Sequence, residues 1–324
     1  MRRDHPEESS DWPEQLAVRV ARCYYELGMT QQEIAAFAGI GRARVIRLLA
    51  EARDKGLVTI HINSPLLENV KLAERLVERY GLQTAEVCLS HATDGAELAD
   101  QIAVAASEFV LKLLEDNLTI ALGWGVTLRA LARRIDRTNS KGVSVVSLLG
   151  SLTQRSSIDR FEASTELAAK LGAECFYLPV PIVCDSEKSR DLLIEQFMFR
   201  EIQARALAAD LALVSIGGLN SATIRLASVF DEGECNSANQ HGAIGNFLGF
   251  YIDDQAEAID HPINKKIVGV SGEKFRQIPR RVIVSAGESK VKAMNAVLTK
   301  GLLTDLVTDQ ATARALLNLN TPET

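Results

Sequence analysis

The chain contains 324 residues, of which 47% are hydrophobic, and carries a formal net charge of −6 at pH 7. This length favours one small and one large domain, and the apolar fraction suffices for a sizeable core. No apolar run approaches the ~20 residues of a membrane-spanning helix, and the charged N-terminus lacks the features of a signal peptide, so we expect a cytoplasmic protein without a membrane partner.

The first elements in chain order are predicted to be helical. Residues 1–13 are rich in charge, and we expect them to form a disordered lead-in. Apolar residues recur at helical spacing through residues 14–27, and Gly28 is placed to end that helix. Thr30 is predicted to cap the next helix, because Glu33 follows it at the spacing of a capping box.

Residues 31–53, QQEIAAFAGIGRARVIRLLAEAR, are typical of a helix-turn-helix. Their apolar positions fit two short helices that pack across a turn, and Gly39 stands where this turn needs a residue without a Cβ. In such a unit the first helix crosses the DNA backbone and the second lies in the major groove. We expect the second helix to begin near Gly41 or Arg42 and to turn four apolar residues inward, namely Val45, Ile46, Leu48 and Leu49.

The exposed face of this second helix is predicted to contact DNA. An arginine pairs with two acceptors of guanine or holds a phosphate, and we expect Arg42 and Arg44 to reach bases and Arg47 to reach a base or a phosphate. The candidate DNA-contacting residues are Gln31, Arg42, Ala43, Arg44 and Arg47. The alternative interpretation is an ordinary helical hairpin with a solvated basic face.

The charge distribution favours DNA more than the net charge does. Residues 1–64 contain nine Lys or Arg and nine Asp or Glu, so they are neutral overall. Residues 41–53 carry four arginines against Glu51 alone, which gives this helix a charge of +3. A basic helix on an otherwise acidic protein suits a regulator that makes specific contacts and few non-specific ones.

A small wing is predicted to follow. Residues 54–56, Asp-Lys-Gly, form a turn signal, and residues 57–62 alternate like a β-strand. We therefore expect a winged helix-turn-helix domain at residues 14–62, a linker at residues 63–68 and a second domain at residues 69–320.

The second domain alternates apolar strands with helices. The predicted strands cover residues 85–89, 118–122, 143–149, 174–178, 211–216, 266–270, 281–285 and 304–307. The predicted helices cover residues 66–80, 96–114, 126–135, 160–171, 194–208, 290–300 and 310–318. This order is typical of an α/β fold with a mostly parallel sheet covered on both faces, whose ligands bind beyond the carboxyl ends of the strands.

Four strand-to-helix turns in this domain combine glycine with hydroxyl groups. They are residues 123–127 (GWGVT), 149–153 (LGSLT), 216–221 (IGGLNS) and 286–290 (AGESK). Glycines let backbone amides approach a ligand, and a helix N-terminus favours an anion. Lys290 is placed to neutralise a phosphate or to bond a hydroxyl. Together these turns indicate a polar crevice that suits anions.

The arrangement resembles the SorC family of bacterial sugar-binding transcriptional regulators over about residues 16–317. The motifs that carry the resemblance are LGWGVTL at residues 122–128, HGAIGNFLGFYIDD at 241–254, SAGESKVKAMNAVL at 285–298 and LVTDQATARALL at 306–317. The family implies an effector domain related in fold to sugar-phosphate isomerases and deaminases. It also implies homo-oligomers, often tetramers, whose affinity for operator DNA changes when a sugar, polyol or sugar phosphate binds.

By this resemblance the effector site is lined by Gly123, Gly125, Thr127, Ser151, Thr153, Asp253 and Lys290. Trp124 either stacks on the ligand or packs beneath its loop. One departure from the family pattern is that Asp253-Asp254 is followed by Gln255-Ala256 and not by an acidic-glycine turn. Asp253 is a candidate acceptor for sugar hydroxyls, and its alternative role is that of a turn residue that closes the strand.

Two other classes of protein match parts of the pattern. Related folds isomerise or deaminate sugar phosphates, which needs an acid or base over the reacting carbon. In the related deaminases the turn that matches Gly217-Gly218 leads into Asp-Gly-His, whereas here it leads into residues 219–221, Leu-Asn-Ser, so we expect no enzyme. A structural DNA-binding protein without an effector would not need strand ends rich in glycine and hydroxyl groups. The five cysteines lack the spacing of a metal site, so we expect reduced thiols and neither a metal nor another cofactor.

Overall fold

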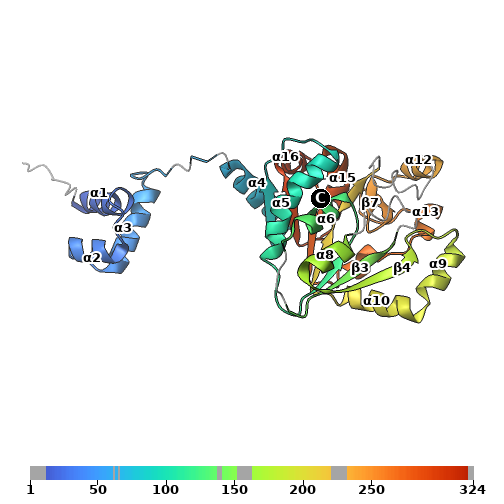
Figure 1. The fold of residues 1–324 in the computed structure, drawn as a ribbon. Coiled ribbons are helices and arrows are strands. Elements are labelled where there is room, and N and C mark those ends of the chain that lie inside the picture. The colour runs from blue at the N-terminus through green and yellow to red at the C-terminus, as the bar shows by residue number, and fades with distance from the viewer. Residues whose placement is uncertain are drawn as a thin grey trace, which may run out of the picture. The chain divides into compact units, whose positions relative to one another are not determined.

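The computed structural model describes residues 12–60, 63–64, 66–136, 141–151, 163–219 and 232–319. They fall into two compact units, within residues 1–65 and within residues 66–324. Figure 1 shows the first unit as a small helical cluster and the second as a sheet flanked by helices. Within the described residues, no helix has the length and apolarity that crossing a membrane would require.

The first unit consists of α1 (Trp12–Tyr25), α2 (Gln31–Ala38) and α3 (Arg42–Asp54). The predicted capping box is confirmed, because the Glu33 amide donates to the Thr30 hydroxyl and the Thr30 amide donates to the Glu33 carboxylate at 2.7 Å. Gly39 ends α2 with a φ of 65°, as the predicted turn requires. The core between the helices is apolar and includes Val20, Ile34, Val45, Leu48 and Leu49.

Two details of this unit differ from the prediction. Residues 57–60 form no strand, and residues 61–62 of the expected wing lie outside the described residues. A strand needs a partner for its backbone groups, and none of the described residues between 55 and the start of α4 (Leu67–Tyr80) forms a second wing strand. Ile46 is 48% exposed and does not face inward, because the buried face of α3 consists of Val45, Leu48, Leu49 and Ala52.

The second unit is built on a seven-stranded parallel sheet with the order β1-β10-β9-β5-β2-β3-β4. Its strands are β1 (Thr84–Cys88), β2 (Thr119–Leu122), β3 (Ser144–Ser151), β4 (Glu174–Pro181), β5 (Leu211–Val214), β9 (Arg280–Val284) and β10 (Asp305–Asp309). Seven of the predicted strands are thereby confirmed with small shifts at their ends. The strand predicted at residues 266–270 is wrong: this buried run lies beyond the strand ends, where Val268 hydrogen-bonds Gly150 and Ile182 and Ile267 forms one isolated bridge.

Helices cover both faces of the sheet (Figure 1). One face carries α5 (Gly95–Leu111), α6 (Val126–Arg134) and α8 (Ser164–Leu171). The other carries α4, α10 (Phe197–Leu207), α15 (Val291–Thr299) and α16 (Gln310–Asn318). Side chains of β2 alternate between the two faces of the sheet. Ile120 and Leu122 pack in the core on the face of α5, α6 and α8, and Ala121 packs in the core on the other face. The predicted helices are confirmed apart from their ends, and residues 160–162 of one lie outside the described residues.

A small antiparallel sheet was not predicted. Its strands are β6 (Ile216–Gly218), β7 (Gly245–Phe247) and β8 (Phe250–Ile252). The segment predicted as one strand at 211–216 is split, because β5 ends at Val214 and the chain enters β6 at Ile216. Leu248 and Gly249 join β7 to β8 with φ values of 51° and 87°, as a two-residue hairpin turn requires. Leucine rarely adopts this conformation, so the sequence gives no turn signal here. Four short helices also escaped prediction, α9 (Glu187–Ile194), α12 (Glu232–Gln240), α13 (Pro262–Lys265) and α14 (Gly272–Phe275).

The buried Asn264 side chain holds the small sheet in place. Its Oδ1 accepts from the Tyr251 amide at 2.9 Å, and its Nδ2 donates to the carbonyls of Tyr251 and Ile259, both at 2.9 Å. These three bonds satisfy buried backbone groups of β8 and of Ile259, which follows β8 in the chain.

We expect Asn264→Leu to lower the free energy of unfolding by about 3 kcal/mol, because leucine removes three buried hydrogen bonds and leaves the Tyr251 amide without a partner. Urea unfolding followed by circular dichroism measures this loss. Asn318→Leu, at an exposed site in the last turn of α16, is the matched control and should change stability little. Equal stability of Asn264→Leu and the wild type would show that the three bonds contribute nothing net.

Candidate functional site

A pocket lies at the carboxyl ends of β2, β5 and β9. The chain leaves β2 through α6 on one face of the sheet and leaves β9 through α15 on the other. These connections diverge, and the strand ends between them stay uncovered, which is where ligands bind in parallel α/β sheets. The cavity has a volume of about 440 Å³, within the range of roughly 300–1,000 Å³ for small-molecule sites.

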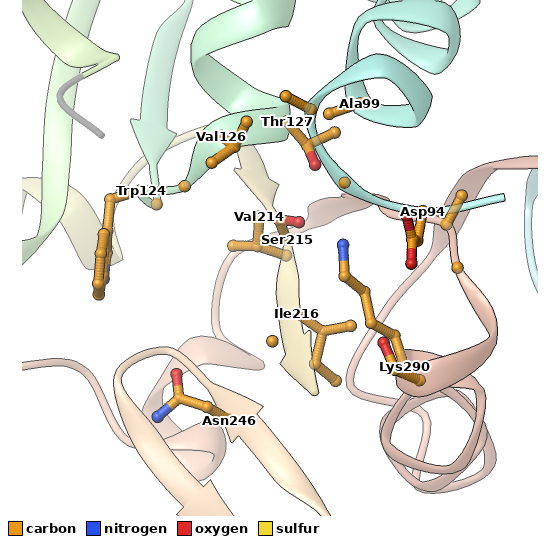
Figure 2. Close-up of a pocket in the computed structure, with 18 of the residues that line it drawn as sticks. Asp94, Ala99, Trp124, Val126, Thr127, Val214, Ser215, Ile216, Asn246 and Lys290 are labelled. Atoms are coloured by element: carbon orange, nitrogen blue, oxygen red, sulfur yellow. The ribbon is translucent and has the colours of Figure 1, made fainter. Parts of the chain in front are cut away.

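Turns that follow strands supply most of the lining (Figure 2). Residues 123–127 come from the end of β2, residues 214–217 from the end of β5, and Ala286, Gly287, Ser289 and Lys290 from the end of β9. Asn246 and the β7–β8 turn line the side next to the small sheet, as Figure 2 shows for Asn246. The pocket is therefore an assembly of chain segments that are far apart in sequence.

Two helices begin at the pocket without a side-chain cap. Asp94 is the N-cap of α5, and its side chain does not bond the first-turn amides. Gly125 is the N-cap of α6 and has no side chain that could do so. Gly125 has a φ of 137° and Gly287 a φ of 114°, a region that other residues rarely adopt. Amides at the start of a helix attract anions and other oxygen acceptors, so the pocket offers donors from two directions.

Lys290 is the only cation and Asp94 the only carboxylate among the described residues that line the pocket. Figure 2 shows the Lys290 amino group extending into the cavity. Burial lowers the pKa of Lys290 from 10.5 to about 8, and no described charge or hydrogen-bond partner offsets this shift. The residue keeps some exposed area because it borders the cavity, while the surrounding protein removes part of the water around its amine. The amine is thus available to a ligand.

The structure brings together five of the candidate effector residues, Gly123, Trp124, Gly125, Thr127 and Lys290. Ser151 is not among the lining residues, because its hydroxyl at the end of β3 donates to the Leu178 carbonyl at 3.1 Å. Asp253 is not among them either, since its carboxylate accepts from the amides of Gln255 and Glu257 at 2.9 Å. These bonds match the turn role that was its alternative. Thr153 lies outside the described residues.

Three polar residues of the lining were not predicted from the sequence, namely Asp94, Ser215 and Asn246. Asp94-Gly95 stands at a strand-to-helix turn like the four that were singled out, so this signal was present in the sequence. Ser215 lies in the single-residue break between β5 and β6, which the prediction treated as one strand. Asn246 depends on the unpredicted hairpin, where its Nδ2 donates to the Gly249 carbonyl at 2.6 Å.

The candidate DNA-contacting residues lie on α2 and α3 of the first unit. Arg42, Ala43, Arg44 and Arg47 are exposed, whereas Gln31 is half-buried and accepts from Arg42 Nε at 3.4 Å. At ~100° per residue, Ala43 and Arg47 lie opposite the buried face of α3, and Arg44 lies on its flank. This geometry makes Arg47 a more central reading residue than the sequence analysis expected.

Comparisons with known proteins agree with this arrangement. Residues 64–318 match the family model Sugar-bind, described as "Putative sugar-binding domain". The chain is 30% identical to the "Transcriptional regulator LsrR" of an Enterobacter strain over 94% of each chain. It is 29% identical to the "Erythritol catabolism regulatory protein EryD" of Brucella abortus, over 95% of this chain and 98% of that one. The crystal structure of the full-length sorbitol operon regulator SorC from Klebsiella pneumoniae matches with a TM-score of 0.73 and 28% identity, over 95% of this chain and 100% of that one.

We expect Lys290→Met to raise the melting temperature of the ligand-free protein at pH 7 by at least about 2 °C, because methionine removes a charged amine that burial has separated from water. The penalty of the amine is fully present below its folded pKa of about 8 and disappears between that value and 10.5, so the gain should shrink as the pH rises through this window. Differential scanning calorimetry at pH 7 and pH 9 measures both effects. Lys292→Met, at an exposed site in α15, is the control, and an equal gain from both variants would contradict the account.

Proposed function

The chain belongs to the SorC family of sugar-binding transcriptional regulators, and from this premise we propose that it binds operator DNA through α3 and that a phosphorylated sugar or polyol in the Lys290 pocket controls this binding. The relatives named above are transcriptional regulators and not enzymes. The observation that carries the proposal is the unpaired, buried Lys290 amine in a cavity lined by helix N-termini.

The chemistry of the pocket supports a phosphorylated effector. The Lys290 amine and the first-turn amides of α5 and α6 supply positive potential for a phosphate. Asp94, Thr127 and Asn246 supply acceptors and donors for hydroxyl groups. An uncharged polyol would bond Asp94, Thr127 and Asn246 and leave the Lys290 amine and the helix amides without an anion. For this reason we favour a phosphorylated effector.

Control of DNA binding follows from linkage. A ligand that binds one arrangement of the protein better than another shifts the population toward it, and operator affinity changes by the same coupling free energy. Reading two half-sites of an operator requires paired α3 helices, so the working form is a homo-oligomer, which we propose to be a tetramer in the cytoplasm. The effector then selects between spacings of the paired helices.

We expect Arg44→Ala and Arg47→Ala each to weaken operator binding about tenfold or more, because each removes a cation from the exposed side of α3. Fluorescence anisotropy with a duplex that the wild type selects from a random-sequence DNA pool measures this. Arg22→Ala, an exposed arginine on α1, is the matched control. Arg44→Ala and Arg47→Ala should both keep the rise in melting temperature that the effector produces in the wild type. Wild-type affinity in Arg44→Ala and Arg47→Ala would show that α3 does not read the operator.

We expect one phosphorylated sugar or polyol in a panel of free and phosphorylated compounds to raise the melting temperature of the wild type, because a ligand of the folded state stabilises it. Lys290→Ala should lose this response, whereas Lys292→Ala should keep it. The affinity should fall as the pH rises above about 8, where the Lys290 amine loses its proton. A response to the unphosphorylated compound alone, unchanged in Lys290→Ala, would refute the phosphate assignment.

A further inference from the structure

An isoleucine stands on the exposed face of α3. Ile46 is 48% exposed, although it directly follows the buried Val45. Its other neighbour in the chain, Arg47, is also exposed. At ~100° per residue, Ile46 lies roughly 110° from the centre of the buried face that Val45, Leu48, Leu49 and Ala52 form. The phase of the helix therefore directs this side chain away from the core.

Ile46 belongs to an apolar strip on this face. Ala43 precedes it by three residues and Ala50 follows it by four, which places all three on one side of the helix. Ala43 is exposed and Ala50 half-buried, and neither side chain extends beyond its Cβ. Arg47 adjoins the strip, whereas the Arg42 guanidinium is bonded to Gln31 of α2. The outward side of α3 is thus part cationic and part apolar.

Base edges in the major groove present one apolar group, the C5-methyl of thymine. The other groups exposed there are hydrogen-bond donors and acceptors, and phosphates carry charge, so an isoleucine gains nothing from either. Contact with the methyl removes apolar surface of both partners from water. Resting on the proposed function that α3 lies in the major groove, we propose that Ile46 reads a thymine C5-methyl in each operator half-site.

The short side chains beside Ile46 support this role. Ala43 and Ala50 leave room for the helix to approach the floor of the groove, where the methyl groups lie. Ile46 then determines one position of the operator by its apolar contact, and Arg47 determines a neighbouring one by hydrogen bonds. The two residues divide the recognition of thymine and guanine between them.

The test uses the full-length wild type and duplexes that it selects from a random-sequence DNA pool. Each thymine of the selected sequence is replaced in turn by deoxyuridine, which keeps the O4 acceptor and lacks only the methyl group. We expect the wild type to lose about fourfold in affinity at one position of each half-site, the change that corresponds to one buried methyl group. Ile46→Ala should bind the thymine duplex more weakly and show no further loss with deoxyuridine at that position.

Two further variants keep the result interpretable. Ile46→Val retains a branched side chain and should keep part of the methyl sensitivity. Phe37→Ala removes an apolar residue that is 68% exposed on α2, and it should keep the full sensitivity at the same position. Circular dichroism melting should show Ile46→Ala as stable as the wild type, because the side chain is outside the core.

The possible outcomes separate this inference from the proposed function. A wild type that selects a sequence but is insensitive to every thymine-to-deoxyuridine replacement overturns the inference alone. Sensitivity that persists unchanged in Ile46→Ala also overturns it, because another residue then reads the methyl group. A wild type that selects no sequence overturns the proposed function and this inference together.

Discussion

The ligand pocket depends on the change of face between the connections that leave β2 and β9. Had α6 and α15 covered the same face, their first turns would have closed over the strand ends, and no cavity would remain between them. Because they diverge, the ends of β2, β5 and β9 meet in one uncovered place. The starts of α5 and α6, which cover the same face of the sheet, border that place, so topology supplies donors as well as space.

The buried, unpaired amine of Lys290 is also the group that would bind the anion in the proposed function. Without a ligand the charged Lys290 amine lowers the stability of the fold, because no described partner compensates for the loss of water around Nζ. A phosphate would restore the missing charge partner in a site where the dielectric response is weak and the attraction correspondingly strong. Under the proposed function, the stability that the free protein loses at Lys290 would be regained when the phosphate binds.

Features that depend on short local motifs could be predicted from the sequence. Features that depend on the direction of a helix face, or on contacts between segments far apart in the chain, could not. The glycine turns at Gly123 and Gly287 and the position of Lys290 follow from short motifs at strand ends, which a parallel sheet brings together. The Leu248-Gly249 hairpin could not be predicted, because a leucine with positive φ has no turn signature. Ile46 was placed inward by its apolar character, although the phase set by Val45, Leu49 and Ala52 directs it outward. Asp253 was assigned to the ligand because its neighbours matched a motif, whereas its carboxylate closes a local turn.

The capping box of α2 has a consequence for how fast a target is found. The Glu33 carboxylate occupies the amide end of α2, and its hydrogen bonds to Thr30 lower its pKa, so it stays ionised. A carboxylate at this helix start disfavours a DNA phosphate there, so under the proposed function the phosphate contacts would come from cationic side chains such as the arginines of α3. With one phosphate contact fewer, the protein would then leave non-operator DNA sooner and sample more of the genome per unit time.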